Sequence, residues 1–461
     1  MHLLYVPTHR PALDSVAAYV RETAFLSRLT RAPVAFALVE AQDGPWVQAH
    51  AHLLYELGQE LNLDTYHITA EWFEGWLRVL LEELELPQAQ ADYFMRLLHP
   101  PGLAYGAGPN KAALLGAALG ARVLHRRDSD TLPSRSAADV ERYPVALELR
   151  AITRRLDQIR LRRPNGDRDA RGAPPGRSSL PPVQLQDQPE PSATPPEDVV
   201  HLVATTYSGD PPVDHRALLE AGIEFPLRIE ALSAPGQSAV ELAAELQESL
   251  VAEPARNYPE DFLELDETGR VEMGASCSAD LWRAIPELPM VDTLGSDDVV
   301  KNLLNVLQHP VIFHARKVLH RYDAERAAAK PDNIASYALC KLRQILLSRV
   351  LLSGAEGAQS SGLALDSTLL RELFARARAA VDPAQLRDVI AEFARVHATA
   401  ANRTTGRVRD GLVSAAQAVE RAGGQLIDQV LSGIDDYTQL LDVWPGLIDV
   451  AARCGLTGEP A

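Results

Sequence analysis

The first 135 residues alternate between strand-like and helix-like segments, and this alternation constrains the fold more than any other feature of the sequence. Apolar runs typical of short buried strands occur at Leu3 to Val6, Val34 to Val39 and Thr65 to Ile68. Segments with helical spacing separate them, at Leu13 to Leu29 and Trp46 to Leu61. Alternating strands and helices build a parallel sheet with helices on both faces. The sequence therefore predicts an α/β fold with a Rossmann-type sheet.

Polar residues collect where these strands are predicted to end. The carboxyl ends of parallel strands meet at one edge of the sheet, and ligands bind beyond that edge. Further along the chain, a loop opens a helix of small residues, and the first amides of such a helix can point at an anion. The candidates for binding a nucleotide at this edge are Pro7, Thr8, His9, Arg10, Glu40, Asn110, Lys111 and Arg127.

Two carboxylates follow the fourth predicted strand, which begins at Arg122 to His125. Asp128 and Asp130 are two residues apart, and alternate residues of an extended chain share a side. Carboxylates placed in this way can hold one hard cation, and that cation can hold a diphosphate. Asp128 and Asp130 are therefore predicted to bind Mn²⁺ or Mg²⁺.

The remainder of the chain divides by composition. Residues 162–197 are rich in Pro, Gly, Arg, Ser and Gln and nearly free of aromatic residues, so we expect this insert to be disordered. Strand-like segments resume after it, and from Ile334 to Ala452 the pattern is helical throughout. The expected organisation is a first half over residues 1–161, the insert, a second half over 198–328 and a C-terminal all-α region over 329–461.

Taken together, these motifs resemble glycosyltransferases of the GT-A fold that carry an Asp-x-Asp motif. In that family the first strand ends in a Pro-containing loop, here Pro7 to Arg10. A loop with Asn and Lys, here Asn110-Lys111, then leads through a small-residue helix to the Asp-x-Asp motif, here Asp128 to Asp130. The resemblance covers about residues 1–325, so the first half would bind a nucleotide sugar and the second half an acceptor.

The resemblance implies metal-dependent transfer of a sugar from a UDP- or GDP-sugar to a small soluble acceptor. Asp297 or Asp298 would be the general base of an inverting reaction. In a retaining reaction these residues would bind the acceptor, and by their position they are also ordinary helix caps. His314 or His320 would complete the metal shell, and a histidine ligand favours Mn²⁺. The residues left for the donor sugar or the acceptor are Tyr207 and Asp210.

Two other functions stay open at this point. A nucleotidyltransferase also places a metal and carboxylates on an α/β sheet, but its loop after the first strand usually carries glycines, which Pro7 to Pro11 lacks. The second alternative is a non-catalytic GT-A-like protein that binds a partner through its helical tail. That tail is open to three roles: closing over the acceptor, forming a homodimer, or stabilising the fold.

Composition excludes several other classes of protein. The formal net charge of −17 argues against a protein that coats nucleic acid or an anionic membrane. The three cysteines lie far apart, which argues against a disulfide framework. The amino terminus lacks the pattern of a signal peptide, and no apolar run reaches the roughly 20 residues that span a bilayer. We therefore expect a soluble cytoplasmic protein.

Overall fold

The computed structural model describes residues 1–101, 104–135, 141–161, 199–209, 213–233, 261–266, 273–293, 299–301, 303–304, 307, 309–321, 324–355 and 367–456. The insert predicted to be disordered, residues 162–197, lies outside these ranges. So do three candidate site residues, Asp210, Asp297 and Asp298.

The amino-terminal half forms a parallel sheet. Its strands are β1 (His2–Thr8), β2 (Val34–Glu40), β3 (Asp64–Ile68) and β4 (Val123–Arg126), and they lie in the order β3-β2-β1-β4. The chain therefore moves from β1 to one side for β2 and β3 and crosses to the other side for β4. The carboxyl ends of β1 and β4 border the point where the strand order reverses, which is where open α/β sheets bind ligands.

Helices cover both faces of this half, as alternation along β1 shows. Leu4 and Val6 pack with residues of α1 (Leu13–Leu29) and α2 (Val47–Leu61). Leu3 and Tyr5 point to the opposite core, which contains residues of α3 (Ala70–Glu83), α4 (Gln88–Leu98) and α5 (Ala107–Ala118). Because successive side chains of a strand point to opposite faces, a buried strand of this kind must be apolar throughout.

The carboxyl-terminal half of the sheet is mixed rather than parallel. Among the described residues, the sheet has eight strands in the order β3-β2-β1-β4-β10-β7-β11-β9. β10 (Met273–Ser278) is antiparallel to β4 and to β7 (Leu202–Thr205), whereas β11 (Val311–His314) is parallel to β7. β9 (Leu263–Leu265) closes the edge antiparallel to β11. The predicted α/β class is confirmed, and the parallel pairing predicted for the amino-terminal residues holds for β1 to β4, whereas the later strands make the whole sheet mixed.

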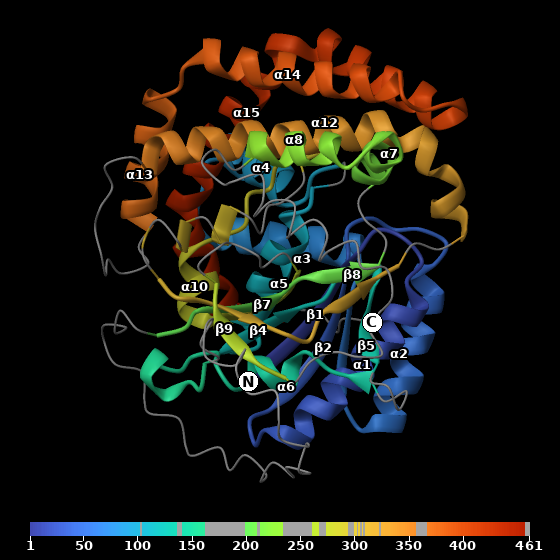
Figure 1. The fold of residues 1–461 in the computed structure, drawn as a ribbon. Coiled ribbons are helices and arrows are strands. Elements are labelled where there is room, and N and C mark those ends of the chain that lie inside the picture. Colours follow the sequence, from blue (N-terminus) through green and yellow to red (C-terminus); the bar gives the residue numbers. More distant parts are fainter. Residues whose placement is uncertain are drawn as a thin grey trace.

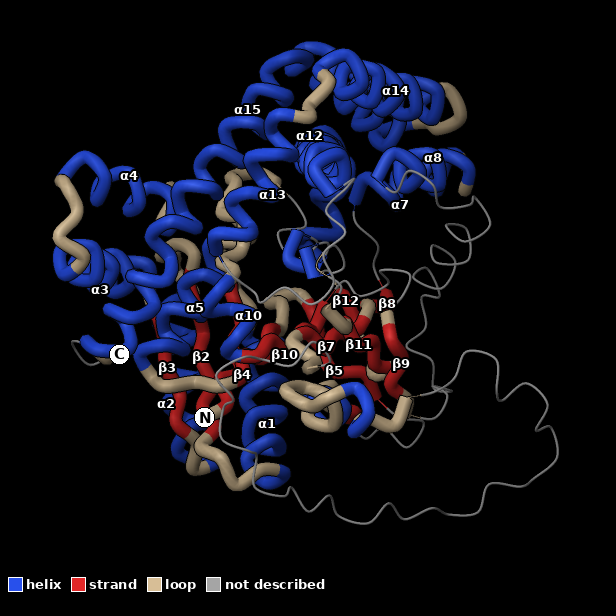
Figure 2. Tube along the Cα trace, turned by 90° about the vertical axis from the view of Figure 1, so that its left-hand side faces the viewer, coloured by secondary structure: helices blue, strands red, loops and turns tan. Residues whose placement is uncertain are grey.

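A small second sheet continues from the ends of strands in the main sheet. Three of its strands follow main-sheet strands after a few residues: β5 (Thr131–Arg135) follows β4, β8 (Tyr207–Gly209) follows β7, and β12 (Val318–His320) follows β11. The order is β6-β5-β12-β8, with β6 (Glu141–Arg142) at the edge. Figure 2 shows β12 and β8 next to the end of the main sheet. This continuation joins segments from both halves of the chain at the carboxyl ends of β4, β7 and β11.

The predicted C-terminal helical region is also confirmed. It consists of α12 (Ala324–Ala355), α13 (Ser367–Ala379), α14 (Pro383–Ala401) and α15 (Gly406–Cys454), and α12 and α14 lie above the sheet in Figure 1. α15 bends at Gly423, where φ is 36°, and its later part packs on α5. Shorter helices complete the described chain: α6 (Val145–Glu148), a 3₁₀ turn at Leu156–Gln158, α7 (Val213–Ala221), α8 (Glu224–Ser233) and α10 (Ala279–Ala284).

The helical region is fastened to the α/β sheet by hydrogen bonds as well as by packing. The Tyr437 hydroxyl donates to the carbonyl of Pro286 (2.8 Å), and the Trp444 indole donates to the carbonyl of Trp282 (3.1 Å). Apolar residues of α15 belong to the same core as those of α3, α5 and α10. Within the described residues, no helix is long and apolar enough to cross a membrane.

Candidate functional site

The small second sheet brings one aspartate of the Asp-x-Asp motif into contact with a histidine from the second half of the chain. Nε2 of His320 lies 3.0 Å from Oδ2 of Asp130. The pairing of β5 with β12 sets this contact, because His320 is opposite Thr131 in the register and the amide of Arg321 donates to the carbonyl of Asp130 (2.8 Å). The imidazole of His320 also meets the ring of Tyr207 edge-on, with centroids 5.3 Å apart. Tyr207, Asp130 and His320 thus share one location.

The loop after β1 supplies a cation to the same location. Nη2 of Arg10 lies 2.9 Å from Oδ2 of Asp130 and 3.4 Å from the Ser129 hydroxyl. Thr8 fixes this loop, since its hydroxyl donates to the carbonyl of Arg10 (2.9 Å) and accepts from the amide of Arg10 (3.3 Å). The side chains of Arg10 and Asp130 stay partly exposed, at 22% and 13%. The arginine predicted to bind a nucleotide therefore lies beside the predicted metal ligand.

Asp128 has a different partner. Its Oδ1 accepts from Nε of Arg126 (3.0 Å), and Nη1 of Arg126 also lies 3.4 Å from both carboxylate oxygens of Glu287. The segment from Asp128 to Thr131 is a turn, closed by the amide of Thr131 donating to the carbonyl of Asp128 (3.1 Å), and not the extended stretch that the sequence suggested. Each aspartate of the motif is consequently paired with an arginine, and Arg126 is shared between Asp128 and Glu287.

Arg127 lies in the core and not at the nucleotide edge, contrary to the sequence prediction. Its guanidinium is fully buried and forms two hydrogen bonds with the carboxylate of Glu22 (2.8 and 3.0 Å) and an ion pair with Glu148 (2.9 Å). Burial opposes the charge, but the two carboxylates more than compensate and raise the pKa of Arg127. Both carboxylates come from helices far from Arg127 in sequence, so the strand pattern alone gave no sign of them.

His314 belongs to this same buried network, which excludes it from the Asp130 location. The imidazole is fully buried and its Nε2 lies 3.7 Å from Glu148. Burial lowers the pKa of His314, so the ring is neutral at physiological pH. Burial alone would raise the pKa of Glu148, but the charge of Arg127 and the hydrogen bond from His125 hold it well below its usual range. Of the two candidate histidines, only His320 lies beside Asp130.

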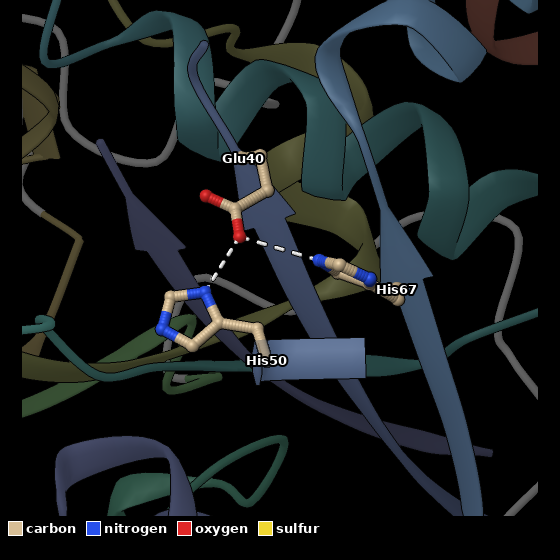
Figure 3. Close-up of side chains that lie close together, drawn as sticks. All are labelled: Glu40, His50 and His67. Carbon is tan, nitrogen blue, oxygen red and sulfur yellow. Dashed lines mark hydrogen bonds and ion pairs between the residues drawn. The ribbon is translucent and has the colours of Figure 1, made fainter. Parts of the chain in front are cut away.

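Glu40 is fully buried and so is not open to a nucleotide, and Figure 3 shows His50 and His67 pointing at one of its carboxylate oxygens. Its Oε1 accepts from Nδ1 of His50 (2.8 Å) and Nε2 of His67 (3.2 Å), and its Oε2 accepts from the indole of Trp46 (3.3 Å). The carboxylate is fully buried. Burial would raise the pKa of Glu40, but the histidine hydrogen bonds outweigh it and lower that pKa.

Glu40, His50 and His67 form a group whose possible metal-ligand atoms all lie within 4.8 Å of one another. Within the described residues, this is the group of three such side chains. The hydrogen bonds of His50 argue against a metal there. The amide of Ala12 donates to Nε2 of His50 (3.0 Å), so the ring proton must be on Nδ1, where it donates to Glu40. A metal on Nδ1 would force a proton onto Nε2, against the Ala12 amide. The group therefore holds the ends of β2 and β3 and the segment after β1 together.

Asn110 and Lys111 lie inside the first turns of α5 and not in a loop ahead of it. The side-chain amide of Asn110 donates to the carbonyl of Glu287 (2.7 Å) and accepts from its amide (2.7 Å). Nζ of Lys111 donates to the carbonyl of Glu40 (3.3 Å) and lies 4.7 Å from the Phe73 ring centre. Burial lowers the pKa of Lys111 to about 8. Both side chains hold backbone segments together. The sequence suggested that they bind a nucleotide, but neither is placed to do so.

The remaining candidates, Pro7 and His9, lie at and just after the end of β1. Pro7 is the penultimate residue of β1 and packs so closely on Gly108 that a Cβ there would lie 2.7 Å from the Pro7 side chain. His9 is half-buried in the same loop, and its carbonyl accepts from the Gln42 side chain (3.3 Å). Arg126, which the sequence offered beside Arg127 as a phosphate contact, and Glu287, which the sequence did not single out, complete the surroundings of Asp128. Arg126 could have been favoured by strand alternation, since it faces the side opposite to Arg127; nothing in the sequence identified Glu287.

Comparison with known families gives one match that spans the chain. The profile of a family of unknown function (DUF6271) matches residues 2–169 and 187–460. No curated protein matches the chain.

Proposed function

The chain belongs to this family of unknown function, and from the residues at the carboxyl edge of its sheet we propose that it is a metal-dependent glycosyltransferase that uses a nucleoside-diphosphate sugar. The observation that carries the proposal is the 3.0 Å contact between Asp130 and His320, with Arg10 at 2.9 Å from the same carboxylate. A carboxylate, an imidazole and a guanidinium there match the needs of a diphosphate and its counter-ion.

The position of the cluster supports a nucleotide-binding role. Arg10 follows β1 and Asp130 follows β4, the two strands that border the reversal of strand order. Open α/β sheets bind nucleotides at this point. Tyr207 and His320 join this cluster from the other half of the chain, because they lie on strands of the small second sheet. A GT-A-like division into a nucleotide half and an acceptor half fits this arrangement.

The residue types suit a divalent metal ion, although the ligand atoms of Asp128, Asp130 and His320 do not all lie within 4.8 Å of one another, so Asp128 would have to approach the other two when an ion binds. Asp128 and Asp130 offer hard oxygen ligands, His320 adds a nitrogen, and such a mixed set suits Mn²⁺ better than Mg²⁺. Each aspartate is paired with a guanidinium, so an ion bound there would compete with Arg10 and Arg126 for the carboxylates. When bound, the ion would stabilise the charge that develops on the departing diphosphate. Asp128, Asp130 and His320 would hold it.

The arginines at the site have a second use. A guanidinium is a planar double donor that matches phosphate oxygens, and Arg10 and Arg126 lie on the two sides of the Asp-x-Asp turn. We assign Arg10 to the diphosphate, because its side chain is the more exposed of the two (22% against 11%). Arg126 is shared with Glu287 and would position Asp128.

Transfer also needs an acceptor and, for inversion, a base. Tyr207 lies against His320 and is proposed to contact the donor sugar or the acceptor. Asp210 is proposed to do the same, and Asp298 or Asp297 to take the proton from the acceptor hydroxyl. The acceptor is proposed to be a small molecule.

Product analysis tests the proposal. The protein is incubated with Mn²⁺ and a panel of UDP- and GDP-sugars, and the released nucleotide is identified by chromatography. We expect slow release of UDP or GDP, which even hydrolysis without an acceptor would give. Formation of pyrophosphate from a nucleoside triphosphate and a sugar phosphate, with the nucleoside monophosphate transferred to the sugar phosphate, would point to a nucleotidyltransferase. No turnover of any donor, together with no metal-dependent nucleotide binding, would contradict both enzyme functions.

A further inference from the structure

A cavity lies between α4 and the helical region. Its volume is about 530 Å³, within the range of roughly 300–1,000 Å³ that small-molecule sites occupy. The walls come from α4, α12, α15 and the segment 289–292, and we call this cavity the helix pocket. The residues that carry the following argument are Tyr93, Arg96, Met290, Asp292, Arg343 and Asp436.

The helix pocket is built by specific contacts. Arg343 of α12 donates from Nε to the side chain of Gln429 (3.1 Å) and from Nη1 to the carbonyl of Asp292 (2.9 Å). Asp292 adopts a left-handed backbone conformation with φ of 52°, which is uncommon for a residue other than glycine. Met290 packs so closely on Gly433 of α15 that a Cβ there would lie 2.5 Å from its sulfur. The segment 289–292 is therefore held on both sides.

The helix pocket is lined by two arginines and two aspartates. Arg96 forms no hydrogen bond or ion pair within the described part of the chain, and Nη2 of Arg343 has no hydrogen-bond partner there. Two acids oppose them: the Asp292 carboxylate makes no hydrogen bond with the described residues, and Asp436 accepts from the Tyr93 hydroxyl (2.5 Å). Burial and the neighbouring Asp436 raise the pKa of Tyr93, so its hydroxyl stays protonated and keeps donating.

The helix pocket also has an apolar wall. Leu97, Pro289, Met290 and Val291 line the helix pocket, and Val291 is 43% exposed although it is a large apolar residue. A ligand with a single charge would leave one pair of charged side chains facing solvent or repelling it. A ligand that carries both charges on an apolar body would satisfy the arginines, the acids and the apolar wall together.

We propose that the helix pocket binds a small zwitterion with an apolar body, of the amino-acid class, with its carboxylate at Arg343 and Arg96 and its ammonium at Asp292 and Asp436. This site is distinct from the one at Asp130 and its test does not depend on sugar transfer. The nearest connection between the two is Glu287, which contacts Arg126 and precedes the segment 289–292 by two residues.

Three probes with the same ring and different charges test the assignment by calorimetry or ligand-observed NMR. They are L-phenylalanine, which carries both charges, 3-phenylpropionate, which carries the negative one, and phenethylamine, which carries the positive one. We expect phenylalanine to bind with a Kd of about 1 mM or below, as ligands of this size can. We expect each single-charge probe to bind at least about tenfold more weakly, since each loses charge-assisted hydrogen bonds.

Two variants and a control locate the binding. Arg343→Met should weaken phenylalanine and phenylpropionate at least about tenfold and leave phenethylamine unchanged. Ser432→Trp adds a bulky side chain at an exposed lining residue and should abolish binding of all three probes without touching the core. Arg395→Met, at an exposed position on α14, is the matched control and should bind like the native protein. Equal affinity for the three probes, binding that survives Ser432→Trp, or no binding of phenylalanine at tens of millimolar would overturn the proposal.

Discussion

Nε2 of His320 lies 3.0 Å from Oδ2 of Asp130, although 190 residues separate the two in the chain. The contact exists because β5 follows the Asp-x-Asp turn directly and pairs with β12, which ends at His320. The same carboxylate receives Arg10 from the loop after β1. Three distant segments thus meet on one oxygen atom, and the proposed function depends on that meeting.

Arg10→Met is expected to weaken nucleotide binding. The variant removes the guanidinium assigned to the diphosphate, and loss of a charge-assisted hydrogen bond costs about 1.5–3 kcal/mol. Titration of UDP and GDP in the presence of Mn²⁺ should show this as a higher Kd with little change in the melting temperature of the free protein. Arg28→Met, at the exposed end of α1, is the control. An unchanged Kd for Arg10→Met would remove Arg10 from the diphosphate.

Asp298→Asn is expected to separate binding from transfer. The amide keeps the size of the side chain and its ability to cap a helix, but it cannot accept a proton from the acceptor hydroxyl. Nucleotide affinity should stay within about twofold of the native value, a difference well under 1 kcal/mol. Transfer to acceptor should fall by about 10²-fold or more, as loss of a general base implies. Near-native turnover would assign no base role to Asp298.

The Glu40, His50 and His67 group gives a prediction about metal removal. The hydrogen bond from Ala12 to His50 indicates a structural brace, so treatment with a chelator should leave the melting temperature unchanged in the absence of nucleotide. His50→Ala should lower the free energy of unfolding by about 1–3 kcal/mol, because the buried Glu40 loses a donor. His52→Ala changes a neighbouring exposed histidine and should have little effect. A metal that copurifies with the native protein and is absent from His50→Ala would contradict the brace.

The buried Arg127 is expected to matter for stability and not for nucleotide affinity. Arg127→Met leaves the carboxylates of Glu22 and Glu148 buried without their cation, a loss that typically costs about 3–5 kcal/mol. Urea unfolding followed by circular dichroism measures this directly. Arg371→Met, which breaks an exposed ion pair with Asp442, should change stability by no more than about 0.5 kcal/mol. Similar unfolding midpoints for the two variants would contradict the burial of Arg127.

Because buried histidines resist protonation, the free energy of unfolding is expected to decrease as the pH is lowered below neutrality. Burial, together with the neighbouring His309, lowers the pKa of His201 to about 4, whereas an unfolded histidine titrates near its ordinary value of 6.5. Between those two pH values only the unfolded chain binds the proton, so the free energy of unfolding should decrease as pH falls, by up to about 1.4 kcal/mol per pH unit for this group. His201→Gln should flatten the profile over that range, and His52→Gln should not. Equal slopes for all three proteins would refute the assignment.

The part of the fold that depends on local patterns could be predicted from the sequence. The first strands are apolar runs with helical segments between them, and β1 and β2 appear where those runs are. β10 could not be recognised, because Met273 to Ser278 contains Gly, Ala and Ser, which have low strand propensity, and resembles a loop. It is a strand because β4 and β7 pair with it on both sides.

The site was predictable only as a set of residue types. The order of Arg10, Asp130 and His320 along the chain suggested a shared location, and the structure brings these three together. The sequence could not distinguish Arg126 from Arg127 or His320 from His314, because those choices depend on Glu22 and Glu148, which approach from distant helices. Glu40, Asn110 and Lys111 have the chemistry of ligand groups, but hydrogen bonds to neighbouring segments occupy them.

Metal-dependent nucleotide binding by Asp130→Ala tests the central claim most directly. The melting temperature is measured for the native protein, Asp130→Ala and the exposed control Asp388→Ala, each with UDP or GDP and with or without Mn²⁺. The account predicts that nucleotide and Mn²⁺ together stabilise the native protein and Asp388→Ala, and that Asp130→Ala loses this stabilisation while it remains folded. The same Mn²⁺-dependent stabilisation in Asp130→Ala, or its absence from the native protein, would contradict the account.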